Sequence, residues 1–335
     1  MTVAFGTGTV RPACVCTLEE ATDERSVGGK AWNLARMLRL GVPVPRGIVL
    51  TDAAFQAFLE ENRLRGAIAR IRQGVEPSDL NSVKRAAEAI RALVDEASVP
   101  EEARAALAHG RHYLDDGRLL IVRSSAVGED STSTSFAGQL DSFRDVRSPG
   151  ELERALLGCW ASCWSERALY YQHSRGVPIE RMGVVVQEQV RSKAAGVLFT
   201  VSPEREGEML GEFCPGDGED LVSGRINPGR FSIAREDGAY RLLAEPEQPD
   251  RDACTSTLLD AAQIRALHRL GLLLENELGG PQDVEWTVDE DGLVEIVQSR
   301  PITVPENRTT IAGVPSEEVE GPPVVWSNAN INENY

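Results

Sequence analysis

Four polar residues near the end of the chain have types and spacing that suit a cation and phosphate site. They flank an Asp-Gly pair at 291–292, which is a signal for a tight β-hairpin turn. In that hairpin Glu285 faces Gln298 and Asp283 faces Arg300, so all four side chains share one face. Carboxylate and amide oxygens suit Mg²⁺, and a guanidinium beside them binds phosphate oxygens. The pattern indicates a magnesium and phosphate site, and a solvated polar face is the alternative.

The opposite face of this hairpin is apolar. The same alternation places Val284, Trp286, Val288 and Val297 together, and we expect them to face the core. A four-residue loop in place of the two-residue turn shifts the pairing by two residues and leaves both faces unchanged.

A Gly-Gly-Lys motif in the first half could bring a second cation. In Ser26–Lys30, SVGGK, the glycines let a backbone approach a ligand closely, and Lys30 adds a point charge. The motif is not a Walker A loop, because the spacing GxxxxGK[ST] is absent and Ala31 follows the lysine. A surface turn is the alternative interpretation.

A third candidate lies in RLLIVRSSAVGEDSTSTSFAGQLDS, residues 118–142. An apolar strand over 118–123 ends on Arg123, and mostly small residues follow. We interpret the strand as delivering Arg123 to phosphates and the loop as a flap that closes over them and excludes water. Phe136 would be the apolar tip of this flap and the Ala-Gly pair at 137–138 its hinge. A polar surface loop is the alternative.

A nearly all-apolar strand, MGVVVQEQV at 182–190, ends in Gln187, Glu188 and Gln189. The edge of such a strand could offer backbone N–H and C=O groups to an adenine ring. An ordinary core strand with polar ends is the alternative.

Hydrophobic periodicity predicts the elements that position these residues. The first half is mixed helix and strand, and the second half is β-rich with one long helix. The predicted helices cover 31–38, a segment capped by Thr51, two or more helices in 79–116 broken near Pro100, 150–175 and 260–278. The predicted strands include 118–123, 182–190, a hairpin with its turn at 237–238 and the terminal hairpin.

Composition limits the classes of partner. The 335 residues are 41% hydrophobic and 26% charged, with a net charge of −17, which argues against a nucleic-acid backbone binder. No run of apolar residues is long enough for a membrane span and no signal peptide is recognised, so we expect a cytoplasmic protein. Six scattered cysteines without nearby histidines are expected to be free thiols rather than zinc ligands.

Taken in order, these segments resemble one family. SVGGKAWNLARMLRLGVPVPRGIVLT, VRSSAVGEDSTSTSFAGQLDSF, VVVQEQV with GVLFTVSP, LVSGRINP and DVEWTVDEDGLVEIVQSRPI resemble the N-terminal ATP-binding domain of phosphoenolpyruvate synthase, which pyruvate phosphate dikinase and rifampin phosphotransferase share. The resemblance covers about residues 25 to 304. It implies an α+β, ATP-grasp-like fold with ATP in the cleft between two subdomains. We expect these at 1–180 and 181–305, with 306–335 as a linker toward a further domain.

For the phosphate and metal end of the site, the resemblance assigns residues that were already singled out. It implies that Lys30 and Arg123 hold phosphates and that Arg300 reaches the β- and γ-phosphates. It also implies that Glu285 and Gln298 ligate Mg²⁺. These are the expected catalytic and metal-binding residues.

For the remainder of the nucleotide, the resemblance implies a loop around Gly138 that covers the phosphates, with Ser142 near their end or near the ribose. Gln187, Glu188 and Val190 would border the adenine. The expected cofactors are therefore ATP and Mg²⁺.

In this family ATP gives a pyrophosphoryl group to a histidine on a separate swivelling domain. Hydrolysis or a second transfer follows, and the histidine then passes its phosphate to an acceptor such as pyruvate. None of the four histidines here lies in the Thr-Ser-Gly-Gly…His context of that domain, and we expect all four to be structural or surface residues: His109, His112, His173 and His268. The expected partners are a phosphocarrier histidine domain and an acceptor-binding domain, on a longer chain or on separate proteins. Two alternatives are an ATP-grasp ligase or condensing enzyme that activates a carboxylate, and a non-catalytic nucleotide-binding module.

Two features depart from the family pattern: the phosphocarrier histidine and the acceptor-binding domain are missing, and one segment carries extra acidic residues. CPGDGEDLVSG carries Asp217 and Asp220 where relatives read closer to Gly-Leu-Gly-Glu-Ala-Leu. Residues 326–335, WSNANINENY, resemble the start of the next segment of multidomain relatives. We therefore expect a piece of a longer protein, with a natural stand-alone half as the alternative.

Overall fold

The computed structural model describes most of the chain. The described residues are 14–115, 117–129, 140–218, 221, 226–246 and 258–302. The expected flap with Phe136 and Gly138 lies outside them, as do Asp220 and the expected linker at 306–335.

The first half of the chain builds a five-stranded sheet that is antiparallel throughout, with the strand order β1-β2-β5-β3-β4. Its strands are β1 (Val15–Thr17), β2 (Gly47–Leu50), β3 (Leu120–Ala126), β4 (Ser142–Val146) and β5 (Met182–Glu188). The central strands β5 and β3 are almost entirely buried, as expected for strands covered on both faces.

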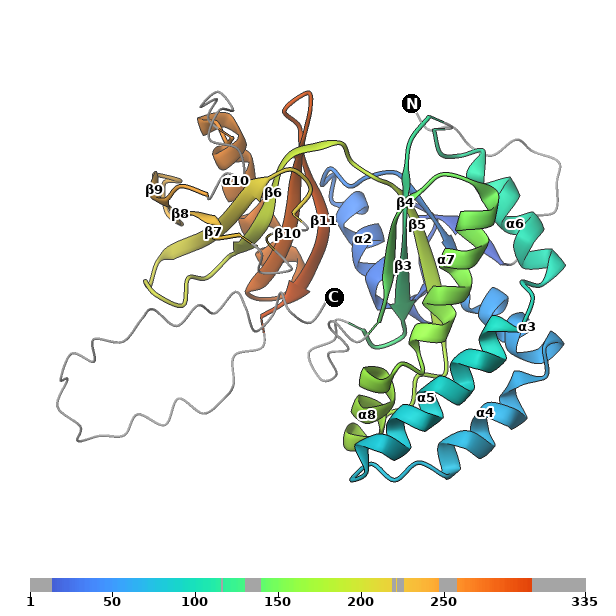
Figure 1. The fold of residues 1–335 in the computed structure, drawn as a ribbon. Coiled ribbons are helices and arrows are strands. Elements are labelled where there is room, and N and C mark those ends of the chain that lie inside the picture. Colours follow the sequence, from blue (N-terminus) through green and yellow to red (C-terminus); the bar gives the residue numbers. More distant parts are fainter. Residues whose placement is uncertain are drawn as a thin grey trace, which may run out of the picture.

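Six helices gather on one side of this sheet (Figure 1). They are α3 (Asp52–Glu61), α4 (Leu64–Gln73), α5 (Leu80–Asp95), α6 (Glu101–Arg111), α7 (Pro149–Ser162) and α8 (Glu166–Arg175). Their core centres on aromatic rings, with Phe58 stacked on Trp160 at 4.5 Å between ring centroids. The single helix predicted over 150–175 is two helices, because Ser165 caps a new helix by accepting from the N–H of Ala168.

The second half builds a six-stranded antiparallel sheet in the order β11-β10-β6-β7-β8-β9 (Figure 1). Its strands are β6 (Ser192–Phe199), β7 (Glu208–Pro215), β8 (Gly229–Ala234), β9 (Tyr240–Ala244), β10 (Gln282–Asp289) and β11 (Val294–Pro301). One long helix, α10 (Ala261–Leu278), packs on it and begins with a capping box between Asp260 and Gln263.

Two N-terminal helices lie between the sheets (Figure 1). They are α1 (Glu24–Val27) and α2 (Gly29–Arg39), and α2 buries Ala31 and Leu34 in one hydrophobic core with the second sheet and α10. Two hydrogen bonds reinforce this contact: the N–H of Ile296 donates to the carbonyl of Pro43 at 2.8 Å, and Arg36 donates to the carbonyl of Glu277 at 3.1 Å.

The α+β fold class predicted from the sequence is confirmed. The chain passes from the first sheet to the second between Glu188 and Ser192, because β5 pairs with β2 and β3. This changeover comes later than the boundary at 180/181 expected from the sequence. Among the described residues, no helix combines the length and apolar character needed to cross a membrane.

The terminal hairpin has the predicted pairing at the polar positions. Glu285 pairs with Gln298 and Asp283 with Arg300. A β-bulge between Glu285 and Trp286 shifts the register nearer the turn, so Trp286 pairs with Ile296. As a result Ile296 is buried in the core, and the prediction that Val297 faces the core is wrong, because Val297 is only half-buried.

Candidate functional site

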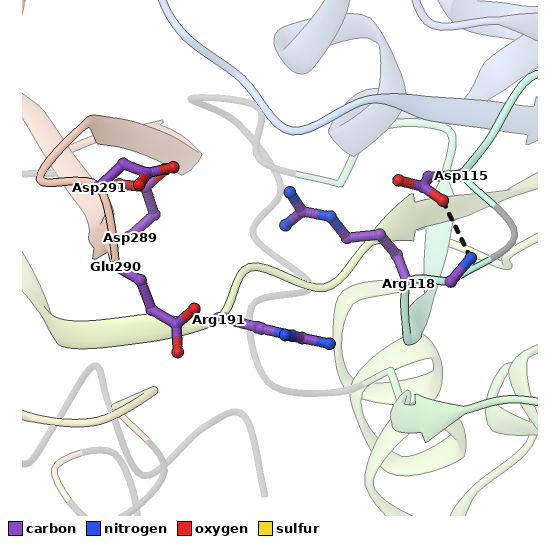
Figure 2. A pocket seen from close by; sticks show the side chains of 7 residues that line it. Asp115, Arg118, Arg191, Asp289, Glu290 and Asp291 are labelled. Carbon is purple, nitrogen blue, oxygen red and sulfur yellow. Dashed lines mark hydrogen bonds between the residues drawn. The ribbon is translucent and has the colours of Figure 1, made fainter.

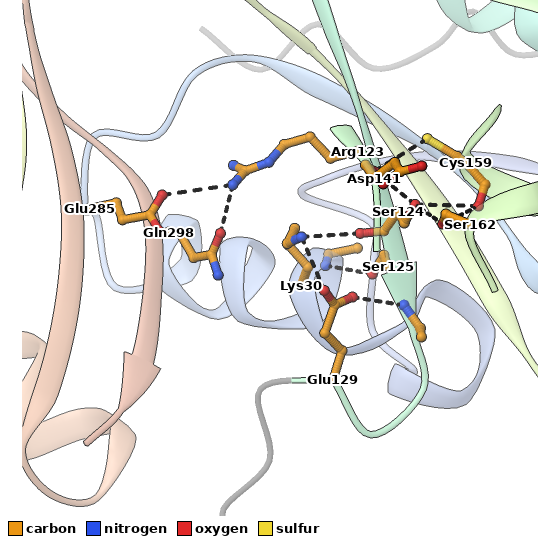
Figure 3. A network of polar contacts seen from close by, with 12 residues as sticks. Lys30, Arg123, Ser124, Ser125, Glu129, Asp141, Cys159, Ser162, Glu285 and Gln298 are labelled. Carbon is orange, nitrogen blue, oxygen red and sulfur yellow. Dashed lines mark hydrogen bonds and ion pairs between the residues drawn. The ribbon is translucent and has the colours of Figure 1, made fainter. Parts of the chain in front are cut away.

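Arg123 joins the two sheets (Figure 3). It lies on β3 and is buried, and its guanidinium reaches β11, where it donates to the carbonyl of Val297 at 2.8 Å and to Oε1 of Gln298 at 2.6 Å. The same guanidinium lies 3.9 Å from the carboxylate of Glu285. Three of the residues predicted to hold phosphate and metal are thus in contact, although 162 positions separate Arg123 from Glu285.

The hairpin adds a buried ion pair next to this contact. Arg300 Nε donates to Asp283 Oδ2 at 2.9 Å, and both side chains are at least nine-tenths buried. Burial raises the pKa of Asp283, and the negative charge of Glu285 adds to this effect while Arg300 opposes it. The carboxylate of Glu285 is more accessible, at 25% exposure, and is therefore the better placed of the two to meet a ligand.

Lys30 reaches the end of β3 from the first turn of α2. Its ammonium donates to the carbonyl of Ser124 at 3.3 Å and lies 3.1 Å from Oε1 of Glu129. Lys30 and Glu129 are both buried, at 7% and 4% side-chain exposure. Ser124 directly follows Arg123 in β3. The ammonium of Lys30 is therefore held beside the strand position that carries Arg123 (Figure 3).

The structure shows why the two residues before Lys30 are glycines, which the sequence alone did not reveal. A Cβ added to Gly28 would lie 1.8 Å from the carbonyl oxygen of Ser125, and one added to Gly29 would lie 2.0 Å from that of Glu129. The close backbone approach predicted for these glycines is therefore made to β3 and the turn after it. It allows α2 to begin directly against the strand that carries Arg123.

Gly28→Ala is expected to lower the free energy of unfolding by at least about 3 kcal/mol, since it combines positive φ with a backbone clash. Gly41→Ala is the matched control: its φ of +77° is close to the +81° of Gly28, but no neighbouring atom of the described residues lies within 4 Å of the added Cβ. The control should lose only about 1–2 kcal/mol. Urea unfolding of both variants measures the difference, and equal losses would show that the close approach is unimportant.

The residues expected at the nucleoside end are held by partners of their own. Gln187 is buried and donates to the carbonyl of Pro45 at 3.1 Å, while Glu188 accepts from the N–H of Asp115 at 2.8 Å. Val190 lies in the segment between the sheets, and Ser142 opens β4 opposite Arg123 with its side chain exposed. The N–H of Glu188 also donates to the carbonyl of Arg46 at 2.9 Å, and Gln187 lies between its sheet partners Gly47 and Ile121.

Asp217 is one of the two acidic residues that depart from the family pattern, and it also joins the two halves of the molecule. Its carboxylate lies 2.8 Å from the guanidinium of Arg144 on β4. This ion pair connects the loop after β7 with the first sheet. The extra negative charge is thus used in a contact between the two sheets.

A polar pocket of about 270 Å³ lies at the tip of the terminal hairpin (Figure 2). Asp289, Glu290 and Asp291 line one side, and Arg118 and Arg191 face them from the segments before β3 and before β6. The sequence did not predict this pocket. Its lining of opposite, mostly exposed charges is typical of a solvated junction.

The residues at the junction of the sheets fit a magnesium–nucleotide complex. Arg123 Nε and Asp283 Oδ1 are buried and have no hydrogen-bond partner within the described part of the chain, which is unusual for buried polar atoms. The described residues contain no group of three or more His, Cys, Asp or Glu side chains suited to a metal. Mg²⁺ commonly takes one or two protein oxygen ligands and completes its shell with phosphates and water, so Glu285 and Gln298 suffice for such an ion.

Two residues near this junction were not predicted as site members. The sequence places Asp283 on the polar face of the hairpin without indicating a role for it, and it does not indicate Glu129. The signal for Asp283 was its register opposite Arg300. Glu129 had no local signal, because it meets Lys30 from 99 positions away.

The comparisons with known proteins agree on one family. Residues 24–318 match the family described as pyruvate phosphate dikinase, AMP/ATP-binding domain. The chain is 32% identical to a probable phosphoenolpyruvate synthase of Methanocaldococcus jannaschii, covering 82% of this chain and 25% of that protein. It is 34% identical to a rifampicin phosphotransferase of Streptomyces sviceus (84% and 35%) and 32% identical to the prodigiosin synthesizing transferase PigC of Serratia marcescens (85% and 32%).

The chain therefore spans between a quarter and about a third of the length of these relatives. Among solved structures it is similar to a carboxyaminoimidazole ribonucleotide synthase complexed with ATP, at 14% identity and a TM-score of 0.35, covering 82% of this chain and 44% of that one.

Proposed function

The chain belongs to the pyruvate phosphate dikinase AMP/ATP-binding domain family, and from this premise we propose that it is the ATP·Mg²⁺-binding part of a dikinase-type phosphotransferase. Membership of this family supports ATP binding and the ATP-grasp-like fold, both of which the sequence resemblance implied. The supporting observation is the contact of Arg123 with Gln298 and Glu285, because it unites a cation from one sheet with two oxygen ligands from the other.

In this proposal ATP lies between the two subdomains. Glu285 and Gln298 hold Mg²⁺, which neutralises phosphate charge when it is bound. Lys30, Arg123 and Arg300 hold phosphate oxygens, and the charge-assisted hydrogen bonds of the arginines fix their orientation. Because all three cations are buried, their interaction with phosphate is screened less than at an exposed surface.

The remaining members of the site are proposed from the resemblance. The loop around Gly138 covers the phosphates and Ser142 lies near their end or near the ribose. Gln187, Glu188 and Val190 border the adenine at the end of β5 and the start of the segment that leads to the second sheet.

The acceptor is a histidine on a separate domain. ATP would transfer its pyrophosphoryl group to that histidine and release AMP. The terminal phosphoryl group would then leave by hydrolysis or by a second transfer, and the histidine would pass the remaining phosphoryl group to pyruvate or another acceptor. In phosphoryl transfer of this kind the ATP domain contributes positioning and charge neutralisation rather than a nucleophile. The final acceptor would be selected by parts of the relatives that lie beyond the matched region.

Isothermal titration of the purified chain with ATP tests the nucleotide site. We expect binding that is clearly tighter with Mg²⁺ than with EDTA. Equal affinities, or no binding under either condition, would contradict the proposal. Adding a phosphocarrier domain from a relative and following labelled phosphate into histidine tests the transfer step.

A condensing activity is the second candidate, and the observation in its favour is that one relative is named a synthesizing transferase. In that reaction the same nucleotide site would serve the activation of a small substrate. Detection of a condensed product or of an acyl phosphate, without phosphohistidine, would support this candidate over the first.

A further inference from the structure

Glu129 lies in the turn directly after β3 and is fixed by that turn. Its Oε2 accepts from the N–H of Ala126 at 2.9 Å, and its own N–H donates to the carbonyl of Ala126 at 3.2 Å. Gly128 allows this tight turn with a φ of +84°. The carboxylate therefore has little freedom of its own, and its position follows from the end of the strand that carries Arg123.

The other oxygen of this carboxylate meets Lys30. Two of the three N–H groups of the ammonium have partners within the described residues: Glu129 Oε1 at 3.1 Å and the carbonyl of Ser124 at 3.3 Å. This leaves one N–H for a ligand. A buried ammonium without an opposite charge is unfavourable, so the same carboxylate also makes the buried location of Lys30 possible.

We propose that Glu129 is a positioning residue for Lys30 in the nucleotide site. It holds the ammonium at the end of β3, close to the strand position from which Arg123 reaches Gln298, and keeps the third N–H for a triphosphate oxygen (Figure 3). Glu129 itself does not contact the nucleotide. This inference rests on the proposed function, because it assumes that Lys30 binds phosphate.

The alternative is that the pair only stabilises the packing of α2 on β3. The two roles predict different ATP affinities for the double variant of Glu129 and Lys30. A positioning residue acts through Lys30, so its replacement has no further effect on ATP affinity once Lys30 is removed. A purely structural residue changes affinity, if at all, independently of Lys30.

The test is a double-mutant cycle of Glu129→Gln and Lys30→Met, read as ATP affinity with Mg²⁺ by isothermal titration. We expect Glu129→Gln to weaken binding by about tenfold, the size typical of a lost outer partner of a binding side chain. The double variant should bind no more weakly than Lys30→Met alone. Glu206→Gln, an exposed glutamate in the turn before β7, is the matched control and should bind like the unmodified chain.

Circular dichroism and thermal unfolding establish that each variant is folded. Glu129→Asp retains the charge and should bind more tightly than Glu129→Gln; if Glu129→Gln does not fold, the cycle is measured with Glu129→Asp. Binding by Glu129→Gln equal to that of the unmodified chain, or losses that multiply in the double variant, would overturn the inference. If the unmodified chain does not bind ATP at all, the proposed function fails instead, so the two failures are distinguishable.

Discussion

Glu285→Ala is expected to abolish the gain in ATP affinity that Mg²⁺ provides. Glu285 is the charged member of the proposed ligand pair, and its carboxylate is the accessible one on the polar face of the hairpin. Loss of a direct ligand should weaken binding of the magnesium complex by at least roughly 100-fold, since even outer partners of metal ligands account for 10–100-fold. The measurement is isothermal titration with ATP in Mg²⁺ and again in EDTA.

The matched control is Glu290→Ala, which removes an exposed glutamate at the tip of the same hairpin. It should retain the full effect of Mg²⁺. A Glu285→Ala variant that still binds ATP more tightly in Mg²⁺ than in EDTA would show that the metal is held elsewhere.

Arg123→Met should produce a different pattern. Methionine keeps an apolar stem of similar reach but donates no hydrogen bond, so ATP affinity should fall by about 10–100-fold, as for a lost hydrogen bond to a charged group. The improvement of affinity by Mg²⁺ should remain, because Glu285 and Gln298 are unchanged. Titration under the same two conditions separates this variant from Glu285→Ala.

Arg147→Met is the control for Arg123→Met, since it changes an exposed arginine that directly follows β4, the strand paired with β3. It should bind ATP like the unmodified chain. If Arg123→Met also retained full affinity, Arg123 would have to be regarded as a structural link between the sheets only.

The sequence predicted much of this arrangement because the relevant signals were local. The Asp-Gly turn and the alternation of the terminal hairpin were enough to pair Glu285 with Gln298. The apolar run before Arg123 predicted its strand, and helical spacing after Lys30 predicted α2.

Other features depended on contacts that no local pattern encodes. The bulge between Glu285 and Trp286 places Ile296 rather than Val297 in the core, and the alternation of residue types did not indicate it. The Lys30–Glu129 pair forms only when α2 docks on the end of β3. β5 belongs to the first sheet because it pairs with β2 and β3, and no local pattern in its sequence indicates these partners.

The position of α2 has a consequence for engineering. This helix belongs to the N-terminal part of the chain, yet it shares its hydrophobic core with β10, β11 and α10. A chimera assembled by exchanging halves at the linker before β6 would pair a foreign helix with a native partner surface, or the reverse. Recombination with a relative should therefore keep α1, α2 and the Pro43 loop together with the C-terminal hairpin, so that the inherited unit is defined by packing rather than by order along the chain.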